Sequence, residues 1–141
     1  MKAPDESTIV VVDDDYDSLE VIRRVLEAYR YKVSGYLDPM EALEHMAVQK
    51  PDLVITDLIM KSIDTGLSFA RQIKYDPRFK DIPVILVTAA FTQREIAIQP
   101  KGAADLKKMG VDAYFDKPFS PEKLVGKVKE LLALAMEGRG K

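Results

Sequence analysis

Acidic side chains follow two short apolar runs at the points where those runs end. Val10–Val12 leads directly into Asp13 and Asp14, and Leu53–Thr56 leads into Asp57. The carboxyl ends of parallel strands meet at one crevice of an open α/β sheet, so these acids are expected to lie together. Clustered carboxylates repel one another unless a cation neutralises them, and Mg²⁺ takes oxygen ligands. The spacing therefore predicts a magnesium site built from aspartates.

Length and composition bound the class of protein. The chain has 141 residues, enough for one domain with a sizeable core. Its formal charge of −2 gives no electrostatic footprint for nucleic acid, and the lack of cysteine excludes disulfides and thiol catalysis. No apolar run approaches the roughly 20 residues of a membrane span. We therefore expect a cytoplasmic protein that binds neither nucleic acid nor membrane directly.

Strand-like and helix-like segments alternate along the chain, which predicts a parallel sheet with helices on both faces. The predicted strands are the apolar runs Ile9–Val12, Tyr31–Tyr36, Leu53–Thr56, Ile82–Thr88 and Val111–Phe115. The predicted helices cover Asp15–Arg30, a segment starting at Asp38, a segment between Gly66 and Asp76, Ala103–Met109 and a segment from Ser120 to Gly138.

The fold class that follows is a doubly wound, five-stranded parallel α/β sheet of the flavodoxin-like type. Right-handed crossovers leave few topologies, and the strand order 2-1-3-4-5 brings the first and third strands together. We expect residues 1–141 to form a single domain with a folded core of about 7–136. Asp15 is assigned to the cap of the first helix rather than to the metal, and His45 to a solvated helix position.

Four motifs follow the strands in a specific order. They are Val-Val-Asp-Asp at 11–14, Thr-Asp-Leu at 56–58, Val-Thr-Ala at 87–89 and Tyr-Phe-Asp-Lys-Pro-Phe at 114–119. Each motif is weak alone, but the order and spacing together are specific. From about Ser7 to Met136 the chain resembles the CheY-like receiver domains of response regulators in two-component signalling.

The resemblance implies that Asp57 accepts a phosphoryl group from a histidine kinase or a phosphotransfer protein in a Mg²⁺-dependent reaction. The domain would catalyse only its own phosphorylation and dephosphorylation. Lys117 would contact the phosphoryl group, Thr88 would hydrogen-bond it, and Tyr114 would report the change at the surface. The metal ligands implied are Asp14, the Asp57 carboxylate and the Ile59 backbone carbonyl, with Asp13 acting through water. The Lys117–Pro118 peptide would be cis.

The chemistry of these residues agrees with the resemblance. Phosphoryl transfer needs an in-line nucleophile, a divalent cation and positive charge near the equatorial oxygens. Asp57 can be the nucleophile, and Mg²⁺ with Lys117 can stabilise the developing charge.

Two alternatives remain open. One is a Mg²⁺-dependent phosphatase with an aspartyl-phosphate intermediate; Ile59 stands where such enzymes commonly carry a second acid, which argues against it. The other is a degenerate receiver that signals without phosphate, ranked last because Asp14, Asp57 and Lys117 are all present.

The expected output is a change in binding to a downstream protein partner. The face of the fourth helix, fifth strand and fifth helix would carry it, and is also a candidate homodimer surface. The chain departs from the family pattern at Met60-Lys61, at Asp64–Gly66 and in an enlarged segment between Thr88 and Tyr114, with the excess around 91–102. Whether the domain acts alone or within a larger regulator stays open at this stage.

Overall fold

The computed structural model describes residues 6–57, 65–88 and 110–139, and it contains one five-stranded parallel sheet. The strand order β2-β1-β3-β4-β5 confirms the predicted topology. The strands are β1 (Thr8–Val12), β2 (Lys32–Tyr36), β3 (Leu53–Thr56), β4 (Val84–Thr88) and β5 (Ala113–Asp116). The helices are α1 (Tyr16–Ala28), α2 (Pro39–Val48), α3 (Thr65–Tyr75) and α5 (Pro121–Arg139). The predicted helix Ala103–Met109 lies outside the described residues.

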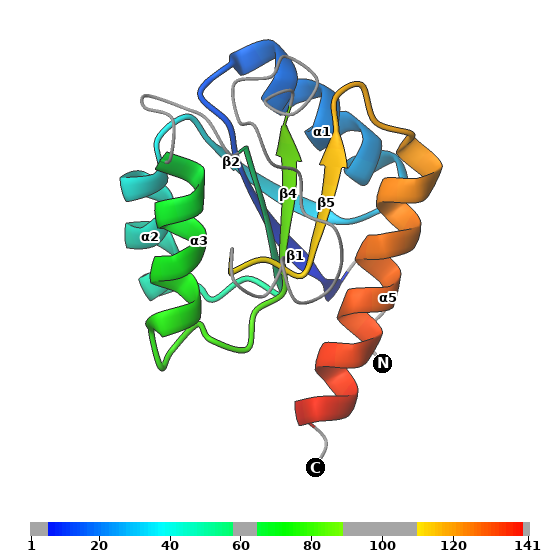
Figure 1. The fold of residues 1–141 in the computed structure, drawn as a ribbon. Coiled ribbons are helices and arrows are strands. Elements are labelled where there is room, and N and C mark those ends of the chain that lie inside the picture. Colours follow the sequence, from blue (N-terminus) through cyan, green and yellow to red (C-terminus); the bar gives the residue numbers. More distant parts are fainter. Residues whose placement is uncertain (1–5, 58–64, 89–109, 140–141) are drawn as a thin grey trace.

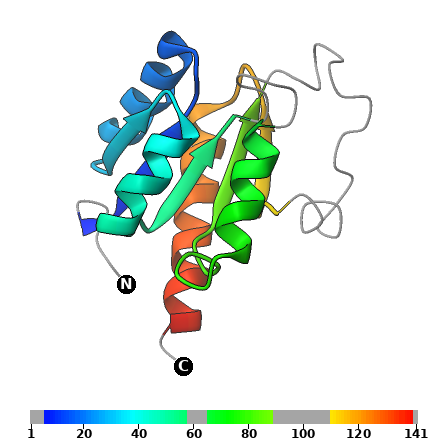
Figure 2. The ribbon, with the colours of Figure 1, turned by 90° about the vertical axis from the view of Figure 1, so that its left-hand side faces the viewer.

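The helices form two layers, one on each face of the sheet. Helices α2 and α3 lie together on one face, and α1 and α5 lie on the other (Figure 1). After a quarter turn, α2 and α3 lie in front of the strands (Figure 2). Alternate residues of each strand enter opposite cores, because successive side chains of a strand point to opposite faces. Val10 and Leu86 belong to the core under α2 and α3, whereas Val11 and Val87 belong to the core under α1 and α5.

Capping residues begin two of the helices as the sequence predicts. Asp15 caps α1 by accepting a hydrogen bond from the Asp17 N–H at 3.2 Å, which confirms the assignment of this acid to the cap. Asp38 caps α2 by accepting from the Met40 N–H at 2.9 Å, with Pro39 at the first helical position. These caps fix where α1 and α2 begin, shortly after β1 and β2 end.

Some predicted boundaries differ from the observed ones. β4 begins at Val84, two residues later than expected, because Pro83 has no N–H for the ladder and the Ile82 N–H donates to Phe79. Val111 precedes β5, although the apolar run includes it. Helix α5 continues past its expected stop at Gly138, to Arg139.

His45 is more than the solvated helix residue that the sequence suggested. It is half-buried, and its Nδ1 atom forms a hydrogen bond with the Tyr36 hydroxyl across the α2–β2 contact. The pattern of α2 places His45 on the helix but does not show that a strand residue lies within its reach.

Candidate functional site

Asp13 and Asp57 meet because their strands are neighbours. β1 pairs with β3 in parallel, with Val12 opposite Thr56, so the residues that follow each strand emerge at the same edge. The ladder continues one step further, since the Asp57 N–H donates to the Val12 carbonyl at 3.0 Å. The Asp13 N–H donates to the Tyr36 carbonyl of β2 at 3.1 Å. The backbone around both acids is therefore fixed by the sheet.

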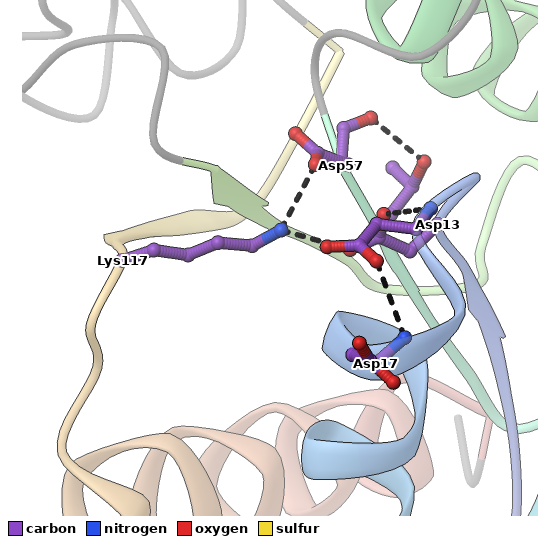
Figure 3. Close-up of polar contacts among 6 residues, drawn as sticks. Asp13, Asp17, Asp57 and Lys117 are labelled. Carbon is purple, nitrogen blue, oxygen red and sulfur yellow. Dashed lines mark hydrogen bonds and ion pairs between the residues drawn. The ribbon is translucent and has the colours of Figure 1, made fainter. Parts of the chain in front are cut away.

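Lys117 joins the two acids from a distant part of the chain. Its Nζ donates to Asp13 Oδ2 at 2.8 Å and to Asp57 Oδ2 at 3.0 Å, and Figure 3 shows the side chain reaching across to both. The Lys117 N–H donates to the Thr88 carbonyl at 2.9 Å, which anchors the lysine backbone at the end of β4. The Lys117–Pro118 peptide is cis, as the resemblance implied.

Burial shifts the pKa values of Asp13 and Lys117 in this cluster. The Asp13 side chain is 1% exposed, Asp57 11% and Lys117 20%. Burial raises the pKa of Asp13, and its hydrogen bonds with Lys117 and the Asp15 N–H offset this effect only in part. For Lys117, burial lowers the pKa, but the Asp13 hydrogen bond and the two negative charges outweigh it, so the net pKa is raised. The lysine is therefore held as an ammonium between two carboxylates.

The donor set fits a hard cation. Mg²⁺ is commonly held by one or two carboxylates together with water or phosphate oxygens, and Asp13 and Asp57 provide two carboxylates at one edge. Asp14 is exposed beside them, and within residues 6–57, 65–88 and 110–139 no three acidic or histidine side chains form a ready-made metal cluster. Ile59, the implied carbonyl ligand, lies outside the described residues, as do the departures at 60–64 and 91–102.

Thr88 and Tyr114 lie on one face of the sheet, on β4 and β5. Thr88 is the last residue of β4 and is 1% exposed. Tyr114 is partly buried, lies opposite Leu86 in the β4–β5 ladder, and packs against the core under α2 and α3. Residues two apart on a strand share a face, so Thr88 and Tyr114 both point toward that core. The structure thus brings together Asp13, Asp57 and Lys117, and places Thr88 and Tyr114 on the neighbouring strands.

A hollow of about 300 Å³ lies beside Lys117 and was not predicted from the sequence. Its walls come from the first turns of α1 and from the start of α5, with Val21 and Phe119 as apolar walls and Asp15 and Asp17 as acids. In the sequence, the apolar residues Val21, Pro118 and Phe119 are the only signal of this hollow, and only the fold brings them together. Val21 is exposed in the structure.

The sequence model of the response regulator receiver domain family matches residues 9–129. That match covers most of the chain and both strands that carry the acids. The chain belongs to the response regulator receiver domain family. It is therefore a receiver domain of the two-component type, in a family of generally non-enzymatic switches, with a CheY-like fold.

Individual relatives agree with this assignment. The chain is 33% identical over 129 residues to the phosphate regulon transcriptional regulatory protein PhoB of Pseudomonas aeruginosa, covering 89% of this chain and 51% of PhoB. It is similar to the signal receiver domain of a signal transduction histidine kinase from Syntrophus aciditrophicus, with 29% identity, a TM-score of 0.74 and 90% of each chain covered. A CheY-like receiver from Methanospirillum hungatei shares the fold at 23% identity, with a TM-score of 0.77 over 94% of this chain and 98% of that one.

The receiver spans about half the length, or less, of the curated relatives that it matches. Among the helices of the described residues, none is both long and apolar enough to cross a membrane.

Proposed function

We propose that this receiver accepts a phosphoryl group on Asp57 from a histidine kinase or phosphotransfer protein, in a Mg²⁺-dependent reaction, and thereby changes its binding to a downstream protein. The observation that supports it most is Lys117, whose Nζ lies within hydrogen-bond distance of both Asp13 and Asp57. A buried ammonium beside an aspartate at a strand end is suited to a nucleophile that gains a highly charged group.

The reaction assigns a separate task to each side chain. One carboxylate oxygen of Asp57 attacks phosphorus, and an O–P bond forms as the P–N bond to the donor's phosphohistidine breaks. The donor imidazole leaves with the electron pair and takes up a proton. Lys117 exchanges one of its carboxylate partners for a phosphoryl oxygen. The Thr88 hydroxyl donates a hydrogen bond to a second phosphoryl oxygen.

Asp13 and Asp57, together with Asp14 and the Ile59 carbonyl, would hold the metal ion. Bound Mg²⁺ supplies positive charge that neutralises the phosphoryl oxygens and orients them. Asp13 keeps one oxygen on the Asp15 N–H at 3.0 Å, which fixes its carboxylate while the other oxygen exchanges partners. The enclosed position of Asp13 strengthens each of these electrostatic contacts, because little water screens them.

The remaining parts of this proposal concern partners and setting. The hollow between α1 and the start of α5 receives the phosphodonor protein, because it opens beside Lys117 and combines apolar walls with acidic residues. Output occurs at the face that includes Tyr114, with a downstream protein or a second copy of the chain as the occupant. We further propose that residues 1–141 form one receiver domain, with a core of about 7–136, that works in the cytoplasm.

Intact mass measurement tests the phosphorylation directly. The protein is incubated with a small acyl-phosphate donor, with Mg²⁺ and with the metal chelated. We expect a gain of one phosphoryl group only with Mg²⁺, its loss on treatment with hydroxylamine, and no gain in Asp57→Asn. Asp81→Asn is the matched control, since Asp81 is exposed and lies away from the cluster. A hydroxylamine-resistant gain, or an equal gain without Mg²⁺, would contradict the proposal.

Hydrogen exchange tests the switch. Beryllium fluoride with Mg²⁺ mimics a phosphoryl group on a carboxylate, and its binding should change amide protection from Thr88 through Asp116. That range includes 89–109, the enlarged segment outside the described residues. Unchanged protection throughout, with the mimic demonstrably bound, would show that the signal leaves by another face.

A further inference from the structure

Asp116 carries a buried oxygen without a hydrogen-bond donor. This aspartate is the last residue of β5 and directly precedes Lys117. Its Oδ1 atom is buried, and none of the residues in the described ranges donates a hydrogen bond to it. A buried acceptor has lost its hydrogen bonds to water, and when no protein donor replaces them it destabilises the conformation in which it is buried. Such a group calls for an explanation, and a store of strain at a functional site is one.

Other acids of the sheet have conventional partners, which makes Asp116 stand apart. Asp52 accepts from the Thr8 N–H at 2.9 Å, and Asp112 accepts from the Val84 N–H at 2.8 Å. Asp13 accepts from the Asp15 N–H and from Lys117. The sheet therefore supplies donors to acids elsewhere, and the deficit at Asp116 is local to the carboxyl end of β5.

The ladder places Asp116 beside Thr88, the proposed phosphoryl ligand, and Tyr114, which belongs to the proposed output face. Asp116 lies opposite Thr88 in the parallel β4–β5 pair, so the two side chains point to the same face. Tyr114 is two residues earlier on β5 and shares that face. Neighbouring strands lie about 4.8 Å apart, so Thr88 and Asp116 are immediate neighbours. Any movement of Thr88 toward a phosphoryl group on Asp57 is a movement away from Asp116.

We propose that Asp116 is a positioning residue that destabilises the resting arrangement of the β4–β5 edge and so favours the phosphorylated one. When Thr88 moves toward the phosphoryl group and Tyr114 turns, Oδ1 gains access to water, and the penalty at Asp116 is relieved. A two-state equilibrium shifts by the difference in free energy between its states, so a penalty confined to one state favours the other. The switching part rests on the proposed function, whereas the destabilisation of the resting form does not.

Two substitutions separate the charge of Asp116 from its capacity to accept. Asp116→Ala removes both, and Asp116→Asn removes the charge but keeps a polar side chain that needs partners. Asp81→Ala is the control, because it removes one carboxylate from an exposed position. The first measurement is chemical unfolding of the unphosphorylated protein. We expect Asp116→Ala to increase the folding equilibrium constant about tenfold, Asp116→Asn to increase it less, and Asp81→Ala to leave it nearly unchanged.

The second measurement is the affinity for beryllium fluoride with Mg²⁺, followed by titration. Asp116→Ala should bind the mimic about tenfold more weakly than wild type, because its resting form is more stable. A gain in stability without a loss of affinity would overturn the switching role, and no gain in stability would overturn the proposal altogether. If wild-type protein failed to bind the mimic at all, the proposed function would fail, while the unfolding comparison would still decide whether Asp116 destabilises the resting form.

Discussion

β3 carries an aspartate just beyond each of its ends, and the two acids are held in different ways. Asp52, before the strand, accepts from the N–H and the hydroxyl of Thr8 at 2.9 and 3.3 Å, and its own N–H donates to the Thr8 carbonyl. Asp57, after the strand, shares the Lys117 ammonium with Asp13. Asp52 is thus tied to a neighbouring strand, whereas Asp57 is paired with a side chain that can change partners.

The same contrast extends along the two edges of the sheet. At the amino edge, Asp112 accepts from the Val84 N–H and from Lys74, which also donates to the Ile82 carbonyl. These contacts join α3, β4 and the start of β5. At the carboxyl edge, charge is concentrated on Asp13, Asp57 and Lys117 instead. The difference teaches that an acid bound to backbone donors ties strands together, whereas the acids bound to Lys117 share a side chain whose contacts can change.

Replacing Lys117 should have the largest effect on stability. Lys117→Met leaves two enclosed carboxylates without their cation, so we expect the free energy of unfolding to fall by about 3 kcal/mol at neutral pH. Mg²⁺ should restore more stability to this variant than it adds to wild type, because the metal replaces the missing positive charge. Chemical unfolding with and without Mg²⁺ measures both effects. Lys117→Arg, which keeps the charge, is the control; an equal loss in both variants would show that packing rather than charge is responsible.

Replacing Asp52 should weaken the fold without weakening the chemistry. Asp52→Ala leaves the Thr8 N–H without its acceptor, and we expect unfolding to become easier by about 2 kcal/mol. Phosphoryl incorporation by the folded protein should stay at the wild-type level. Unfolding curves and intact mass on the same preparation provide the two readouts. If the variant failed to gain a phosphoryl group without denaturant, at a temperature where it is fully folded, the distinction between the two edges would be wrong.

Replacing Asp14 should affect the metal more than the fold. Asp14 is exposed, so Asp14→Asn should change metal-free stability little, and relief of carboxylate repulsion can raise it slightly. If the Mg²⁺ affinity is tenfold weaker, the free energy of unfolding that saturating Mg²⁺ adds falls by about 1.4 kcal/mol. Melting curves across a Mg²⁺ series measure this shift. Retention of the full wild-type shift would remove Asp14 from the set of ligands.

The smallest effect is expected at the end of α1, close to the amino edge. Arg30 adopts a left-handed backbone with φ of 74°, and the Tyr31 N–H donates to the Leu26 carbonyl at the helix end. Glycine adopts this conformation without the steric cost of a Cβ, so Arg30→Gly should stabilise the protein by about 0.5–1 kcal/mol. Thermal unfolding tests it, with Arg24→Gly inside the helix as a destabilising control. An unchanged or lower melting temperature would show that the Arg30 side chain contributes more than its backbone costs.

The sequence predicts the topology and the meeting of Asp13 with Asp57 because apolar runs and the rules for parallel sheets determine which strand ends are adjacent. It also predicts the caps at Asp15 and Asp38, since an N-cap depends on a few neighbouring residues. It does not predict that Lys117 contacts both acids. Strand order identifies an edge but not the reach of a side chain across it.

The sequence predicts least well which polar groups are buried and which partners they bind. The buried Oδ1 of Asp116 and the His45–Tyr36 hydrogen bond depend on residues that are close only in the fold. The predicted start of β4 at Ile82 is wrong for a related reason, since the strand begins at Val84. Ile82 is apolar and buried, but an apolar run does not show where ladder hydrogen bonds begin, and Pro83 has no N–H to contribute.

The paired substitutions Asp57→Asn and Asp52→Asn test the central claim most directly, because they make the same chemical change at opposite ends of β3. Each variant is treated with a small acyl-phosphate donor and Mg²⁺, weighed intact, and unfolded in denaturant. We predict that Asp57→Asn folds and gains no phosphoryl group, whereas Asp52→Asn is less stable and gains as much as wild type. A wild-type gain in Asp57→Asn, or no gain in fully folded Asp52→Asn, would contradict the account.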